Sequence, residues 1–97
     1  MYALAIVRYR KPLDEVLVHV EAHRAYLREL KAKGLLLASG PLEPRNGGAL
    51  LLRVPDGTVD ASLDAIRDED PFIRKGVAQY ELLPWVPVFG KEDLDRI

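Results

Sequence analysis

The order of apolar and polar positions divides the chain into four short apolar runs and two segments with helical spacing. An apolar run of four to eight residues between turn signals is typical of a β-strand, whereas apolar residues three and four positions apart indicate an amphipathic helix. Pro12 ends the first run, and Gly34 marks the end of the first helical segment. The predicted strands cover residues 2–9, 35–39, 49–54 and 77–83, and the last is extended toward Phe89 past two prolines. The predicted helices cover residues 14–33 and about 58–67.

Two shorter segments complete this outline. Asp70 and Pro71 predict the start of a helical turn, because Asp suits the N-cap and Pro suits the first helical position. The final residues, KEDLDRI, predict a short surface helix. The order is therefore β-α-β-β-α-β, the ferredoxin-like arrangement of the α+β class, with a four-stranded antiparallel sheet and both helices on one face. We expect a single domain over residues 1–97, with a core of about 1–89 and a tail of 90–97.

Both faces of the predicted sheet are apolar. The first strand carries apolar side chains on each face, and the runs LLLA and ALLL are apolar at consecutive positions. A sheet with helices on one face normally presents polar residues on the other, so a second apolar face needs a cover. We therefore predict a homodimer in which two sheets pack face to face, with a higher oligomer left open. The alternative is that the strands are short and partly shielded by the tail.

A histidine occupies an apolar position of the first predicted helix. Val16, Val20, Leu27 and Leu30 form one apolar row, and His23 lies in the gap of this row. Burying a polar ring without partners costs about 1–3 kcal/mol, so a polar group is expected to face it. Either a backbone carbonyl satisfies one ring nitrogen, as in many core histidines, or His23 has a functional partner.

Asp70 is the candidate partner of His23. A carboxylate bonded to one imidazole nitrogen fixes the tautomer and leaves the other nitrogen for proton transfer. Asp70 also has an ordinary explanation as a helix N-cap. In a continuous helix from residue 14, His23 would lie about 15 Å from the helix start. The pair then meets only if residues 68–72 fold back toward the helix.

A metal site is the weaker interpretation of the histidines. His19 and His23 are four residues apart, a spacing that chelates a metal when a third ligand is near. The HExxH signature is absent, and His19 lies at the edge of the apolar row. We therefore expect no metal and interpret His19 as a solvated residue.

Composition narrows the classes of function. The formal net charge is −1, from 14 Lys and Arg against 15 Asp and Glu. A general nucleic-acid binder needs a basic face, so we expect no nucleic-acid partner. The lack of cysteine excludes disulfides and a thiolate nucleophile. The first residues, MYALAIVRYRK, are too short for a transmembrane helix and lack the basic start of a signal peptide, so we predict a cytoplasmic protein without membrane contact. The scarcity of Asn, Gln and Met suggests a thermophilic source, which a melting midpoint above about 45–65 °C would support.

An ordered set of residues resembles the YciI-like (YCII-related) family. The set consists of His23 on the first helix, Gly34, ASGPL at 38–42, and DPF at 70–72 followed by Gly76. The resemblance implies a ferredoxin-like fold of the dimeric α+β barrel type, with His23 and Asp70 as the active-site pair. Family members often have an Arg three residues before this His, where the chain has Val20. No anion clamp is therefore carried over, and Arg24 and Arg45 are substitutes that the sequence does not assign.

The resemblance also implies chemistry on small organic molecules. Relatives dehalogenate or isomerise lactone-like or hydroxylated ring compounds, so we predict lyase-, isomerase- or hydrolase-like chemistry without a metal or organic cofactor. His23 would be the general acid/base and Asp70 would orient it. The Ser39 hydroxyl and the Gly40 N–H would donate to a developing oxyanion. The predicted substrate-binding residues are Ser39, Gly40, Pro41 and Phe72.

Other classes of function stay open. The same fold serves as a non-catalytic small-molecule binding or regulatory module, in which His23 would only hydrogen-bond a ligand. RNA-recognition motifs share the element order, but the run ALLLRV lacks their stacking aromatic residues. Trp85 suits either the dimer interface or the wall of a pocket.

Overall fold

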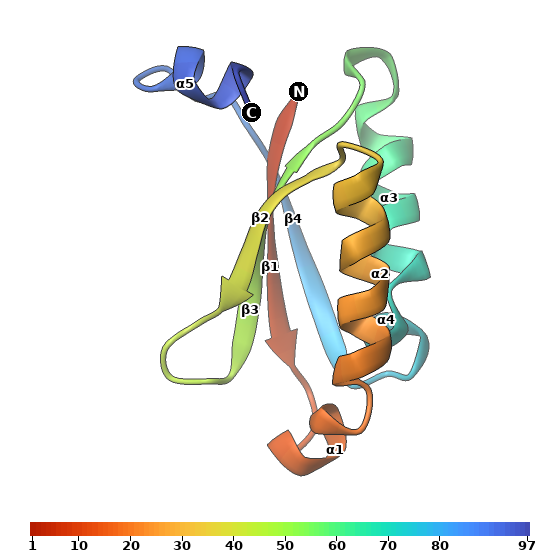
Figure 1. Cartoon of the computed structure of the whole chain (residues 1–97). Helices are drawn as coiled ribbons and strands as arrows, with labels where there is room; N and C mark the ends of the chain where they lie inside the picture. Colours follow the sequence, from red (N-terminus) through yellow and green to blue (C-terminus); the bar gives the residue numbers. More distant parts are fainter.

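Four strands form one antiparallel sheet in the computed structural model, which describes residues 1–97 (Figure 1). The strands lie in the order β2-β3-β1-β4, which confirms the predicted α+β arrangement. Their bounds are β1 Tyr2–Tyr9, β2 Leu36–Pro41, β3 Gly47–Arg53 and β4 Ala78–Trp85. The helices are α1 Leu13–Leu17, α2 Val20–Ala32, α3 Val59–Glu69, α4 Pro71–Arg74 and α5 Lys91–Asp95, with a 3-10 turn at Asp56–Thr58. None of these helices combines the length and the apolar character needed to cross a bilayer.

Helices α2, α3 and α4 cover one face of the sheet (Figure 1). Small and branched side chains of β1 and β3 pack there against the helices, and burying each aliphatic side chain stabilises the fold by about 1.5–3 kcal/mol. This face therefore holds the hydrophobic core. Its buried members are Ala3, Ala5, Val7, Val16, Leu30, Leu36, Leu50, Leu52, Val54, Leu63, Ile66, Phe72, Val77 and Ala78.

The opposite face of the sheet, called the open face below, carries an apolar row across all four strands. The strand register places Ala38 beside Leu51, Leu51 beside Leu4, and Leu4 beside Leu83. Leu83 is 39% exposed, and the helices that form the core lie on the other side (Figure 1). The sheet is thus apolar on both faces, and the protein chain leaves the middle of the open face uncovered.

The prediction of one continuous helix over residues 14–33 is wrong. The structure divides it into α1 and α2, with a turn at Val18 and His19. Val16 is fully buried, whereas Val18 is 76% exposed. No Pro or Gly marks the break, so the apolar spacing continues through it. The turn lets α1 place Val16 in the core while α2 lies along the sheet (Figure 1).

Two strands differ from their predicted ends. β2 continues past residue 39 to Pro41, whereas β4 passes Pro84 and ends at Trp85, short of the predicted extension toward Phe89. Both are edge strands, which tolerate Pro41 and Pro84 because a proline there need not donate to a second neighbouring strand. The loop between β2 and β3 is therefore limited to residues 42–46, since Gly47 and Gly48 belong to β3.

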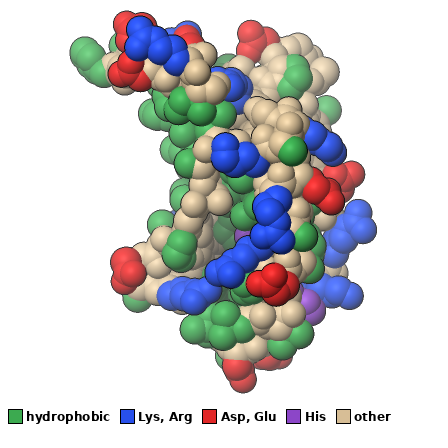
Figure 2. Space-filling model, in the orientation of Figure 1, with side chains coloured by type: hydrophobic (Ala, Val, Ile, Leu, Met, Phe, Trp, Pro, Cys, Tyr) green, Lys and Arg blue, Asp and Glu red, His purple; other side chains and the backbone are tan.

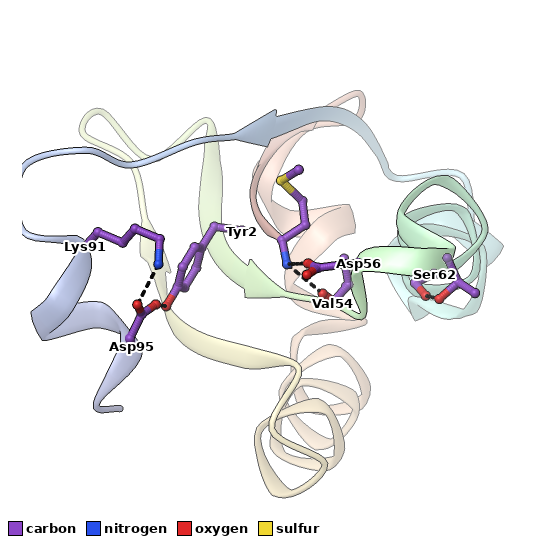
Figure 3. A network of polar contacts seen from close by, with 8 residues as sticks. Tyr2, Val54, Asp56, Ser62, Lys91 and Asp95 are labelled. Atoms are coloured by element: carbon purple, nitrogen blue, oxygen red, sulfur yellow. Dashed lines mark hydrogen bonds and ion pairs between the residues drawn. The ribbon is translucent and has the colours of Figure 1, made fainter.

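Polar contacts hold both ends of the chain at the same end of the sheet (Figures 1 and 3). The N-terminal amine donates to the Val54 carbonyl at 2.9 Å and pairs with Asp56 at 2.6 Å. The Tyr2 hydroxyl donates to Asp95 at 2.5 Å, and Lys91 donates to the same carboxylate at 2.7 Å. These contacts anchor α5 beside Tyr2, at one end of the open face.

Candidate active site

Asp70 is the buried carboxylate around which the site is built. Its side chain has no exposed surface and receives three hydrogen bonds. The donors are His23 Nδ1 at 2.9 Å, the Phe72 backbone N–H at 2.9 Å and the Tyr80 hydroxyl. An unpaired buried charge costs several kcal/mol, so these donors are what allow a carboxylate here. Asp70 is therefore both the N-cap of α4 and the partner of His23.

The local sequence explains how the Asp70 carboxylate is held. A residue before proline is disfavoured in the helical region, and Asp70 is extended with φ −67° and ψ 128°. This conformation ends α3 at Glu69 and starts α4 at Pro71 with no connecting loop. The short connection fixes the carboxylate close to the backbone of α4, where Phe72 donates to it.

His23 reaches Asp70 from the first turn of α2. Because the helix begins at Val20, His23 is its fourth residue and does not lie ten residues along a continuous helix. The side chain is 13% exposed. A carboxylate only accepts hydrogen bonds, so Nδ1 carries the proton that Asp70 accepts, and in the neutral ring the lone pair is then at Nε2.

Aromatic contacts fix the plane of the imidazole. The His23 ring stacks on Phe72 with the ring centroids 3.9 Å apart and the planes 6° from parallel. Tyr9 meets Phe72 edge to face, with the centroids 6.0 Å apart. Neighbours thus hold the His23 ring both at Nδ1 and across its face.

A cavity of about 240 Å³ opens beside His23. Its walls come from the start of α2, the end of β1, the β2–β3 hairpin and α4. This volume is below the roughly 300–1,000 Å³ of pockets for drug-sized ligands and suits a molecule with one ring. The lining includes the four residues that the sequence suggested for substrate binding, Ser39, Gly40, Pro41 and Phe72.

Sequence reasoning missed the two tyrosines of this site. Tyr80 lies on β4 opposite Val7 and so faces the core, and Tyr9 lines the cavity. Alternation along residues 77–83 was the available signal, because it places Tyr80 on the same face as Leu82. Both arginines that the sequence left unassigned, Arg24 and Arg45, also line the cavity.

Two partly buried tyrosines have raised pKa values. Burial raises the pKa of Tyr80 well above its usual range, and the negative charge of Asp70 and the hydrogen bond to it add to the rise. Burial also raises the pKa of Tyr26, with further contributions from the charges of Glu69 and Asp70. Tyr26 donates to the Ile66 carbonyl at 2.6 Å. Both hydroxyls therefore remain protonated donors at neutral pH.

Other candidate residues lie away from this cluster. His19 is the N-cap of α2 and makes no side-chain capping bond. Nowhere does the chain gather three His, Cys, Asp or Glu side chains in an arrangement that holds a metal. Trp85 lies beside Tyr2 in the strand register, is 39% exposed and does not line the cavity. The alternative in which Trp85 forms part of the pocket wall is therefore wrong, and its place at a dimer interface stays a prediction.

Known proteins share this fold. A solved structure of 5-chloro-2-hydroxyhydroquinone dehydrochlorinase from Burkholderia phenoliruptrix AC1100, in complex with 2,5-dihydroxybenzoquinone, is similar with a TM-score of 0.76 and 21% sequence identity. The alignment covers 91% of this chain and 96% of that chain, and at this identity it shows a common fold. No curated protein matches the chain in sequence. The model of the YCII-related domain matches residues 1–86, and the chain therefore belongs to the YCII-related domain family.

Proposed function

We propose that the cavity beside His23 is the active site of a cofactor-independent enzyme acting on a small hydroxylated, halogenated or lactone-like ring compound. One observation carries this proposal: a buried carboxylate holds one nitrogen of an imidazole that lines a cavity of single-ring size. The dehydrochlorinase of similar fold is named for a chlorinated, hydroxylated ring compound, which supports this class of substrate.

His23 is the proposed general acid/base. Its Nε2 lone pair accepts a proton from a hydroxyl or an acidic carbon of the substrate. The electron pair left on the substrate then expels a halide in an elimination, or moves to a neighbouring oxygen in an isomerisation. In the second case His23 returns the proton at another atom. A positioned general base contributes about 10²–10⁴-fold to the rate.

Asp70 is the proposed positioning residue for His23. As a hydrogen-bond acceptor for Nδ1–H, its carboxylate holds the neutral imidazole in the tautomer whose lone pair is at Nε2, and it stabilises the imidazolium formed after proton transfer. The Phe72 N–H and the Tyr80 hydroxyl in turn hold the carboxylate in place. Ser39 and Gly40, at the end of β2, are the proposed donors to a developing oxyanion.

Turnover by substituted proteins tests this proposal. The assay follows halide release from 5-chloro-2-hydroxyhydroquinone and conversion of a panel of lactones and hydroxylated ring acids. We expect His23→Ala and Asp70→Asn each to lower kcat by about 10²–10⁴-fold. His19→Ala is the matched control, because it removes the other histidine of the chain outside the cavity. Circular dichroism and urea unfolding establish that the variants are folded.

A second measurement separates catalysis from simple binding. Nitrogen-15 NMR of the imidazole reports which nitrogen carries the proton. We expect Nδ1–H in the wild type and a changed tautomer balance in Asp70→Asn. A ring that is indifferent to Asp70→Asn, together with unchanged turnover in both variants, would leave Asp70 as a helix cap. The binding or regulatory module would then be the better description of the same cavity.

A further inference from the structure

The charged residues around the cavity have only one sign. Arg24 and Arg45 line the cavity beside His23, and no Asp or Glu lines it. An adjoining depression shares Leu27 and Ser39 with this cavity and adds Arg28 and Lys31, again without an acidic side chain. The walls therefore bring together four cations in a chain whose net charge is −1.

These cations come from two sides of the opening. Arg24, Arg28 and Lys31 follow one another at helical spacing on α2, whereas Arg45 comes from the loop between β2 and β3. Figure 2 shows a row of Lys and Arg side chains crossing this part of the surface, between the hairpin and the helix. An anion in the opening would therefore meet positive charge from both sides.

The two arginines of the cavity are not occupied by strong ion pairs within the chain. Arg24 lies 3.7 Å from Glu21, and both side chains are more than half exposed. An exposed pair of this kind contributes about 0–1 kcal/mol, so it competes weakly with a ligand. Arg45 has no carboxylate within ion-pair distance.

The remaining walls suit the flat part of a ring. Tyr9, Pro41 and Val20 supply accessible apolar surface next to His23, whereas Phe72 is buried beneath the imidazole. A guanidinium recognises a carboxylate or phenolate oxygen through paired N–H donors, while an apolar wall recognises the ring face. Clefts lined by one sign of charge also concentrate ligands of the opposite sign.

We propose that the substrate of this site is a small ring acid, negatively charged at neutral pH, whose anionic oxygens are bound by Arg24 and Arg45 while its ring lies against the apolar wall of Tyr9, Val20 and Pro41. This inference rests on the proposed function for the location of the site, and it adds the charge of the substrate.

Binding of two matched probes tests this inference without any need for turnover. The probes are 2,5-dihydroxybenzoate and its uncharged amide, 2,5-dihydroxybenzamide, titrated by calorimetry and followed by NMR of the His23 ring. We expect the wild type to bind the acid at least about tenfold more tightly than the amide, the usual size of a charge-assisted contact. Arg24→Gln and Arg45→Gln each remove most of this preference, and the double variant removes all of it.

Controls separate a specific contact from general charge. Arg96→Gln removes one cation from the tail beyond α5, far from the cavity, and is expected to leave the preference unchanged (Figure 1). Arg28→Gln, in the adjoining depression, is expected to lower acid binding only two- to threefold. Raising the salt concentration weakens binding of the acid and leaves binding of the amide unchanged, which tests the charge without a substitution.

Each outcome bears on one proposal and not on the other. Equal binding of acid and amide by the wild type, or no binding of the acid, overturns the inference even if His23→Ala abolishes turnover of another compound. A strong acid preference that depends on both arginines supports the inference. It does so even if turnover is unchanged in His23→Ala, a result that would overturn the proposed catalysis alone.

Discussion

At the residue scale, a histidine is stable in an apolar row because neighbouring groups satisfy its ring. Asp70 accepts from Nδ1, and Phe72 covers the face of the imidazole. The sequence identified His23 and Asp70 from their residue types and their neighbours in the chain. It could not show their contact, because 46 residues separate them and a hydrogen bond depends on the angles of both side chains.

The raised pKa of Tyr80 leads us to expect a loss of stability at alkaline pH. Its pKa in the folded protein lies above the unfolded value of about 10, and the same holds for Tyr26. Unfolding therefore releases these protons as the pH rises above about 10, while below that pH both states keep them. We expect the free energy of unfolding to fall above pH 10, by up to about 1.4 kcal/mol per pH unit for each tyrosine.

Urea unfolding at a series of pH values measures this effect. In Tyr80→Phe one of the two groups is gone, so the slope above pH 10 should be about half that of the wild type. Absorbance of tyrosinate gives an independent check, since both hydroxyls should ionise only as the protein unfolds. Equal slopes in the two proteins would mean that Tyr80 is not protected by the fold.

At the element scale, the break between α1 and α2 is what brings the site together. Apolar spacing predicted a single helix over residues 14–33, and in such a helix His23 would be distant from the helix start. Periodicity reports which face of a helix is buried, but a turn without Pro or Gly does not interrupt it. The turn allows Val16 of α1 to be buried in the core. That burial is a tertiary contact, which the local spacing does not report.

The close approach of β1 and β3 leaves no room for a side chain at residue 47, so we expect this position to require glycine. A Cβ on Gly47 would overlap the carbonyl oxygen of Val7 on β1. The strands would have to separate beside the cavity, so we expect Gly47→Ala to lower the free energy of unfolding by about 1–3 kcal/mol. Chemical denaturation followed by circular dichroism measures the change.

Gly40→Ala is the matched control for this substitution. Gly40 also lines the cavity, but a Cβ there meets no atom within 4 Å. Its substitution should change stability by less than about 0.5 kcal/mol, as at most exposed positions. If Gly47→Ala proves as stable as Gly40→Ala, the two strands are free to move apart and the cavity wall is softer than the structure indicates.

At the scale of the whole molecule, the open face of the sheet remains to be covered. The row from Ala38 through Leu51 and Leu4 to Leu83 is apolar, and α5 reaches only the end of this face near Tyr2. We infer that a second copy of the chain packs on this row by a two-fold axis, sheet against sheet. A patch that crosses all four strands can match itself in such an arrangement.

A charge in the centre of this row should therefore separate the copies. We expect the wild type to sediment as a dimer at micromolar concentration and Leu51→Glu to sediment as a monomer, because an unpaired buried carboxylate is costly. Val18→Glu is the control, since Val18 is 76% exposed at the turn between α1 and α2. A monomeric wild type, or a Leu51→Glu protein that remains dimeric, would place any interface elsewhere.

The sequence by itself determined the order of the strands and main helices and singled out two residues of the candidate site. Short apolar runs, helical spacing, the stop at Gly34 and the start at Asp70–Pro71 are local signals, and each depends on only a few neighbouring residues. They were sufficient to predict the sheet and the helices on one face, and to single out His23 and Asp70 as candidates.

Only the tertiary structure decided how these parts meet. The turn at Val18–His19, the third donor Tyr80 and the joint lining of the cavity by Arg24 and Arg45 all depend on contacts between distant segments. Local patterns fix which side of each element is buried, but not where along its length two elements cross. The chemistry of the site depends on that crossing, because hydrogen bonds act over about 3 Å.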